Sequence, residues 1–235
     1  IINLEKTVPL FNDAMNFISG IAQKRGTVLF IGTKRSARES IKEEAGRCGQ
    51  PFMTQRWLGG TLTNFATVKK SVARLKELEA GETDGTFEKL VKHEVLGLRR
   101  EREKLFASLG GIKDMNRLPD AIYGIDIGHE DIAIKEAKKL GIPVIAVVDS
   151  NYDPALVDYP IPGNDDAIRA VQLYARAAAD AVLEGKAAAP NSASVREEEF
   201  SEGDAKAPRG RAPAKKAAPK ADVAANEAAE TPAAE

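Results

Sequence analysis

Short, continuous apolar runs alternate along the chain with longer segments in which apolar residues recur every three or four positions. The longer spacing predicts a helix over residues 7–25, which Gly26 ends. Continuous runs at residues 27–32, 120–126 and 143–148 suit parallel strands that are buried on both faces. The pattern therefore predicts an α/β fold in which helices cover both faces of a parallel sheet of about five strands.

The remaining predicted elements are strands at residues 52–54 and 159–161 and helices at residues 37–48, 130–140 and 164–184. Ser36 and Glu39 have the spacing of a capping box at the start of one helix. Asn164 is expected to cap another, whose first turn would hold Asp165 and Asp166 against the positive end of the helix dipole.

A different pattern interrupts the α/β alternation. Apolar residues recur at three- and four-residue steps in two segments, first Phe65, Val68, Val72 and Leu75, and then Val91, Val95, Leu98, Leu105 and Leu109. Glycines at residues 81–85 supply a turn between the segments, and Arg102 interrupts one apolar position. This spacing predicts a helical hairpin with a coiled-coil seam. Two ordinary crossover helices are the alternative.

These patterns divide the chain into three parts. Residues 1–60 and 110–186 would form the sheet domain, and residues 61–109 the inserted hairpin. Residues 187–235 are rich in Ala, Pro and Lys and have few large apolar side chains, so this tail is predicted to be disordered. A basic run in the tail fits either contact with nucleic acid or a solvated linker.

The composition limits the function classes. The formal net charge is −1, so any nucleic-acid surface must be local. Cys48 is the only cysteine, which excludes a disulfide framework and favours a reducing compartment. The sequence shows neither an apolar run of membrane-spanning length nor a signal peptide, so a cytoplasmic protein without membrane contact is expected.

Positive side chains follow the first predicted strand. Lys34, Arg35 and Arg38 lie where a doubly wound sheet binds anions, at the carboxyl edge beside a helix N-terminus. The loop matches neither of the common glycine-rich nucleotide motifs, so a nucleotide is weakly indicated. The phosphate backbone of a nucleic acid would suit these cations equally well.

Evidence for catalysis or metal binding is weak. Five aspartates could gather at the carboxyl edge of the sheet: Asp126, Asp149, Asp153, Asp165 and Asp166. Their oxygens could hold Mg²⁺, but helix caps and turns explain the same residues. His93 and His129 are isolated, and no nucleophile–base arrangement is apparent. We therefore predict no catalytic residue, no metal and no cofactor.

Residues 54–65 combine the single tryptophan with two adjacent glycines and several small polar side chains. Arg56 could bind phosphate through its guanidinium, and Trp57 could stack on a base. Alternatively, Trp57 could be a core residue at the root of the hairpin.

The same segment carries a family resemblance. Arg56-Trp-Leu-Gly-Gly-Thr-Leu-Thr-Asn-Phe65 closely resembles the signature of the bacterial small-subunit ribosomal protein two family. Further motifs are similar in the family's order: Asn3-Leu-Glu-Lys-Thr7, Phe30-Ile-Gly-Thr-Lys34, Leu109-Gly-Gly-Ile-Lys113, Leu118-Pro-Asp-Ala121, Gly141-Ile-Pro-Val144 and Ile161-Pro-Gly-Asn-Asp-Asp-Ala-Ile168. The resemblance covers about residues 1–186.

The resemblance implies a flavodoxin-like domain with a protruding coiled-coil hairpin, in a structural component of the 30S subunit. It also implies contacts with 16S rRNA, docking of ribosomal protein one, and a ribosome-bound place in the cytoplasm without a small-molecule substrate. The family usually has a His-Phe-Gly-His element before Asn3, so the chain is expected to lack its natural start. A nucleotide-binding α/β enzyme and a Rossmann-like protein-interaction module remain alternatives.

The predicted RNA surface joins two segments. Parallel strands at residues 27–32 and 52–54 should be neighbours and end at the same edge, which would bring their following loops together. The residues expected to face RNA are Lys34, Arg35, Arg38, Arg56, Trp57, Thr63, Asn64, Lys69 and Lys70.

Overall fold

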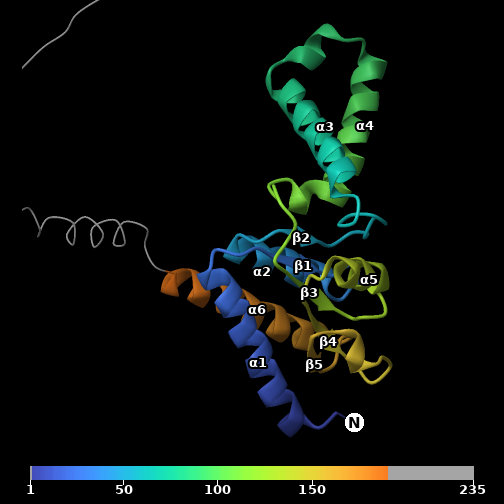
Figure 1. Ribbon diagram of the computed structural model, residues 1–235. Coiled ribbons are helices and arrows are strands. Elements are labelled where there is room, and N and C mark those ends of the chain that lie inside the picture. Colours follow the sequence, from blue (N-terminus) through green and yellow to red (C-terminus); the bar gives the residue numbers. More distant parts are fainter. Residues whose placement is uncertain (1, 190–235) are drawn as a thin grey trace, which may run out of the picture. The chain divides into compact units, whose positions relative to one another are not determined.

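The computed structural model describes residues 2–189, except the side chains of residues 88 and 89, and contains a five-stranded sheet (Figure 1). The strands are β1 (Val28–Ile31), β2 (Phe52–Met53), β3 (Ala121–Ile125), β4 (Val144–Val148) and β5 (Tyr159–Pro162). All neighbours pair in parallel in the order β2-β1-β3-β4-β5, which is the flavodoxin-like order. The predicted fold class is confirmed, with the three continuous apolar runs at the centre of the sheet.

Alternate residues of each strand face two separate cores. Val28 and Phe30 of β1 pack against α1 (Leu4–Gln23), α2 (Arg38–Cys48) and α6 (Ile168–Ala188). Gly185 of α6 allows a close approach to α1, because a Cβ there would lie 2.3 Å from the carbonyl oxygen of Ser19 in α1. Burial of both sides of the central strands explains why their apolar runs are continuous.

The opposite face is covered by α5 (Asp131–Leu140) and by the root of the hairpin. Leu29 and Ile31 of β1 belong to this second core, together with Leu109 and Ile112 at the base of the hairpin. Residues Gly110–Ile112 form the short 3₁₀ helix η2, which links the hairpin back to the sheet. The hairpin root is therefore part of the core that covers one face of the sheet.

Two antiparallel helices lie between β2 and β3 in the chain, as predicted (Figure 1). They are α3 (Phe65–Thr83) and α4 (Lys92–Leu109), connected through the 3₁₀ helix η1 (Thr86–Lys89). Leu75 and Leu78 are buried between them. Arg102, which interrupts the apolar pattern, forms an ion pair with Glu82 on the facing helix. A charged residue is accommodated in the seam because its partner lies opposite.

Both predicted helix caps are wrong. The N-cap of α2 is Ala37, and the Ser36 hydroxyl donates instead to the carbonyl oxygen of Asp165 at 3.3 Å. Asn164 accepts from the backbone N–H groups of Asp166 and Ala167, but α6 begins only at Ile168. Asn164 therefore holds a turn that precedes the helix, and Asp165 lies outside the first helical turn.

Two further expectations concern regions beyond the sheet. The predicted disordered tail, residues 187–235, lies almost entirely outside the described residues, whereas α6 continues to Ala188 instead of ending near residue 184. Within the described part of the chain, no helix is both long enough and apolar enough to cross a membrane.

Candidate nucleic-acid interface

The carboxyl edge of the sheet is occupied by an acidic cluster around Lys34. The Lys34 Nζ atom lies 2.9 Å from carboxylate oxygens of Asp126 and Asp165 and 2.6 Å from Asp166. Asp126 has a positive φ of 68° at the end of β3 and accepts the backbone N–H of Gly128 at 3.0 Å. These contacts join the ends of β1 and β3 to the turn before α6.

The cluster fixes the charge of Lys34 and neutralises it within the protein. Burial disfavours the ammonium form, but hydrogen bonds to Asp166, Asp165 and Asp126 outweigh this and raise the pKa of Lys34 above its usual value. Since its ammonium already faces three carboxylates, Lys34 is not free to neutralise a phosphate. Lys34 therefore holds the sheet edge together, and it is a weaker candidate for RNA contact than the other predicted cations.

Donors of the loop after β1 are also hydrogen-bonded to a side chain of the protein itself. Glu130 accepts both the backbone N–H and the hydroxyl of Thr33, each at 2.7 Å. Burial raises the pKa of the Glu130 carboxyl. In a nucleotide-binding sheet this N–H would face the phosphate of the ligand. Here a carboxylate takes that position, which weakens the nucleotide-binding alternative.

The neighbouring acids could hold a cation only in competition with Lys34. Asp149, Asp165 and Asp166 can each place a ligand atom within 4.8 Å of the others. Two of the three already contact the Lys34 ammonium. Another of the predicted aspartates, Asp153, is explained by a cap, because it accepts the backbone N–H of Ala155.

A buried carboxylate organises the segment between β2 and α3. Glu136 of α5 accepts five hydrogen bonds, from the Trp57 indole (3.2 Å), the backbone N–H groups of Gly60 (2.7 Å), Leu62 (2.9 Å) and Thr63 (3.0 Å), and the Thr63 hydroxyl (3.2 Å). Burial disfavours its ionised form, yet these donors outweigh burial and lower the pKa of Glu136. A single side chain thus fixes the backbone at the hairpin root.

The structure places Trp57 in the core. Its side chain is 7% exposed and packs with Met53, Leu62 and Ile112, while its indole N–H is used by Glu136. A ring in this position has no open face for a base. Of the two alternatives for Trp57, the structure shows the core position at the root of the hairpin.

Glu136 is not predicted from the sequence, although a signal for it is present. Residues 131–140 form an amphipathic helix, and Ala133, Ile134 and Ala137 are buried in the core. Glu136 lies on this same apolar face, three residues after Ala133. An acid at such a position requires hydrogen-bond donors, and the polar backbone of residues 57–63 supplies them.

The other predicted RNA-facing residues lie at or near the surface. Arg35, Arg56, Lys69 and Lys70 are exposed, as are Thr63 and Asn64, and Arg38 is half-buried. Among residues 2–189, none of these five basic side chains has a carboxylate within ion-pair distance. Lys69 lies 5.2 Å from the centroid of the Phe65 ring. Because β1 and β2 pair in parallel, their following loops meet at one edge, as expected.

This arrangement defines a class before it defines a family: a flavodoxin-like α/β protein with a helical hairpin inserted between β2 and β3. Residues 1–185 match the model of the family described as Ribosomal protein S2, and the chain belongs to that family. It is therefore a structural protein of the small ribosomal subunit, from a family without enzymatic activity.

Proposed function

We propose that this protein binds 16S rRNA in the small subunit and helps to dock ribosomal protein one, beside other small-subunit proteins of the cytoplasmic ribosome. The observation that carries the rRNA proposal is the contrast among the predicted cations. Lys34 is neutralised by three carboxylates, whereas Arg35, Arg38, Arg56, Lys69 and Lys70 have no acidic partner among the described residues. Phosphate groups are the partners that such cations fit.

Rigidity of the hairpin root supports the same proposal. The five hydrogen bonds to Glu136 hold residues 57–63, which connect Arg56 to the start of α3. Cations on a fixed backbone bind a structured RNA at a smaller entropic cost than cations on a mobile loop. Docking of ribosomal protein one is proposed from family membership alone.

Direct binding to 16S rRNA tests the proposal. We expect charge reversal at Arg35, Arg56 and Lys69 to weaken binding and to reduce its salt dependence by roughly 0.7–0.9 in slope for each lost phosphate contact. Reversal of Lys138 and Lys139, which are exposed at the far end of α5, is the matched control and should have a smaller effect. Equal salt slopes for the two variants would contradict the assigned surface.

Docking of ribosomal protein one needs a separate measurement. Small subunits assembled with and without this protein should differ in their affinity for ribosomal protein one, with tighter binding when this chain is present. Equal affinity would overturn the docking proposal and leave the rRNA proposal standing.

A further inference from the structure

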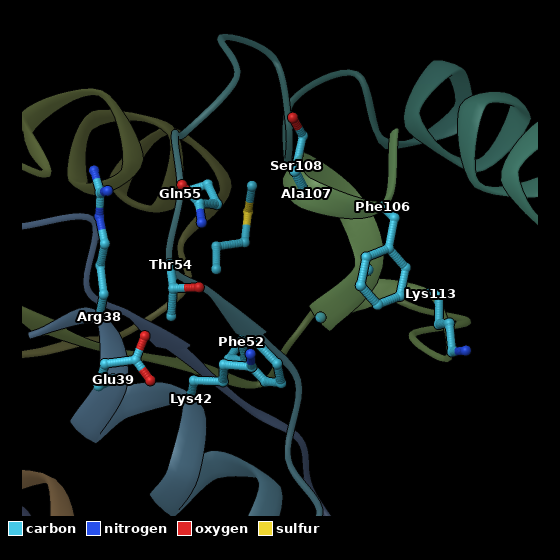
Figure 2. Close-up of a pocket in the computed structure, with 13 residues that line it drawn as sticks. Arg38, Glu39, Lys42, Phe52, Thr54, Gln55, Phe106, Ala107, Ser108 and Lys113 are labelled. Atoms are coloured by element: carbon cyan, nitrogen blue, oxygen red, sulfur yellow. The ribbon is translucent and has the colours of Figure 1, made fainter. Parts of the chain in front are cut away.

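A groove lies between α2, the end of β2 and the base of α4 (Figure 2). Its volume is about 290 Å³. Phe52 and Phe106 supply aromatic surface, and Arg38, Lys42 and Lys113 supply positive charge. This size is near the lower end of the range of small-molecule sites, roughly 300 Å³, so one monomer unit of a polymer fits better than a large ligand.

Two adjacent glycines build the floor of the groove. A Cβ on Gly111 would lie 2.1 Å from the carbonyl oxygen of Phe52 and 2.8 Å from its ring. A Cβ on Gly110 would lie 3.2 Å from the ring of Phe106. Only a residue without a side chain can occupy position 111 so close to β2, whereas a Cβ at position 110 would be a tight contact with the Phe106 ring.

The Phe106 ring is presented outward at the groove although it is apolar. Phe106 is 54% exposed, and Figure 2 shows its ring on the opposite side of the groove from Arg38 and Glu39. It is one residue removed from the buried seam and contributes little to the core. An exposed aromatic ring with open surface can stack on a base, independently of the identity of that base.

The charged residues that line the groove are mostly positive. The Nε atom of Arg38 donates to the carbonyl oxygen of Thr33 at 2.9 Å, which orients the guanidinium. Lys42 is exposed, and Lys113 has only a weak contact, 3.8 Å, with Glu79. Glu39 is the single acidic residue of the lining, so cations exceed acids by two. A groove that holds both cationic side chains and an aromatic ring matches a nucleotide, with its phosphate and its base.

From this juxtaposition we infer that the groove binds one unstacked nucleotide of single-stranded RNA, with the base on Phe106 and the phosphate at a cation of the lining, Lys42. The inference rests on the proposed rRNA binding and states which RNA conformation this surface selects. Duplex RNA is disfavoured because its bases are stacked and paired and cannot reach the ring.

A short single-stranded RNA tests the inference with the full chain. The probe is fluorescein-labelled oligouridylate of about eight nucleotides. We expect Phe106→Leu to weaken its binding by about 5- to 100-fold, and Lys42→Gln to lower the salt slope by about 0.7. Photo-crosslinking of the wild-type complex should label Phe106 or its neighbours at the groove. A duplex of the same length should bind without dependence on Phe106.

Leu96→Ala is the matched control, because Leu96 is an exposed apolar residue of the same helix, 50% exposed, and does not line the groove. It should bind the probe like the wild type, and all variants should unfold at the wild-type temperature. An oligouridylate that does not bind, or that binds Phe106→Leu unchanged, overturns the inference. Tighter binding of an acidic, tyrosine-containing peptide at Phe106 also overturns it, in favour of a protein ligand. If wild type and Phe106→Leu bind small subunits equally well but the oligouridylate test fails, only this inference is lost.

Discussion

At the scale of single residues, the Glu136 carboxylate has the largest set of partners at the hairpin root. Replacing it by Gln keeps the shape but leaves one acceptor oxygen and adds an NH₂ group that faces N–H donors. We predict that Glu136→Gln destabilises the fold by about 1–3 kcal/mol, because buried donors lose their acceptor. Urea unfolding of both proteins measures the difference. An unchanged midpoint would contradict the assigned hydrogen bonds.

A second prediction concerns how the stability difference between wild type and Glu136→Gln depends on pH. The folded pKa of Glu136 is lower than its unfolded pKa, since hydrogen bonds from Thr63, Leu62 and Gly60 outweigh the opposing effect of burial. Ionised Glu136 therefore stabilises the fold above the unfolded pKa of about 4.3, and this contribution is lost as pH falls through the folded pKa. The stability difference between wild type and Glu136→Gln should be constant from about pH 7 to about pH 5 and shrink at lower pH. A difference that grows in acid would have the wrong sign.

Trp57 gives the third residue-scale prediction. Because its side chain is 7% exposed in the core, Trp57→Ala should destabilise folding by about 3–5 kcal/mol. Thermal unfolding and rRNA binding measured on the same sample separate the two roles of this residue. Normal stability with weakened binding would instead indicate that the ring stacks on RNA.

The partners of individual polar side chains are the feature of the site that is hardest to predict from the sequence. A single sequence shows that Lys34 follows a strand, but not that Asp165 and Asp166, more than a hundred residues later, turn toward it. Arg56 and Lys69 are exposed, and neither belongs to an apolar periodicity of the sequence. The outcome for a polar residue depends on which distant groups the fold brings close, whereas an exposed cation needs no such partner.

At the scale of elements, the hairpin depends on a few buried positions. Leu75 is fully buried between α3 and α4, so Leu75→Asp places an unpaired charge in the seam and should reduce both helical signal and thermal stability. Leu98→Asp should have a smaller effect because Leu98 is half-buried. Leu96→Asp, at an exposed position, is the control in circular dichroism. Equal stability of all three would argue against a packed seam.

Glycine at the base of the hairpin sets its approach to β2. Gly111→Ala should destabilise the protein, since the new Cβ would meet the Phe52 carbonyl oxygen at 2.1 Å. Gly97→Ala is the matched control: its Cβ would meet nothing within 4 Å in the middle of α4, so the change should stabilise the helix by up to about 1 kcal/mol. The two substitutions should therefore shift the unfolding temperature in opposite directions. A neutral Gly111→Ala would mean that η2 does not press on β2.

Elements were predicted more accurately than their ends. The apolar runs that became β1, β3 and β4 are continuous because helices cover both faces, a condition that is visible in one sequence. The helix boundaries near Ser36 and Asn164 are not visible in the sequence, because each side chain bonds to a partner other than the helix N-terminus. Side chains such as Ser and Asn favour the N-terminus of a helix, but a nearby carbonyl group or turn can satisfy the same hydrogen-bonding groups.

At the scale of the whole molecule, the near-neutral net charge conceals a division of the described surface. Acids gather around Lys34 at the ends of β1 and β3, and unpaired cations follow β1 and β2 toward the hairpin root. Such a protein should bind RNA over a limited area, as expected for a chain with a formal charge of −1.

Co-sedimentation with small ribosomal subunits that lack this protein tests the central claim most directly. The wild-type chain should migrate with the subunit in moderate salt. A variant with charge reversal at Arg35, Arg56, Lys69 and Lys70 should stay near the top of the gradient. Its unfolding temperature, measured separately, should equal that of the wild type. A folded variant that migrates with the subunit as fully as the wild type would contradict the account.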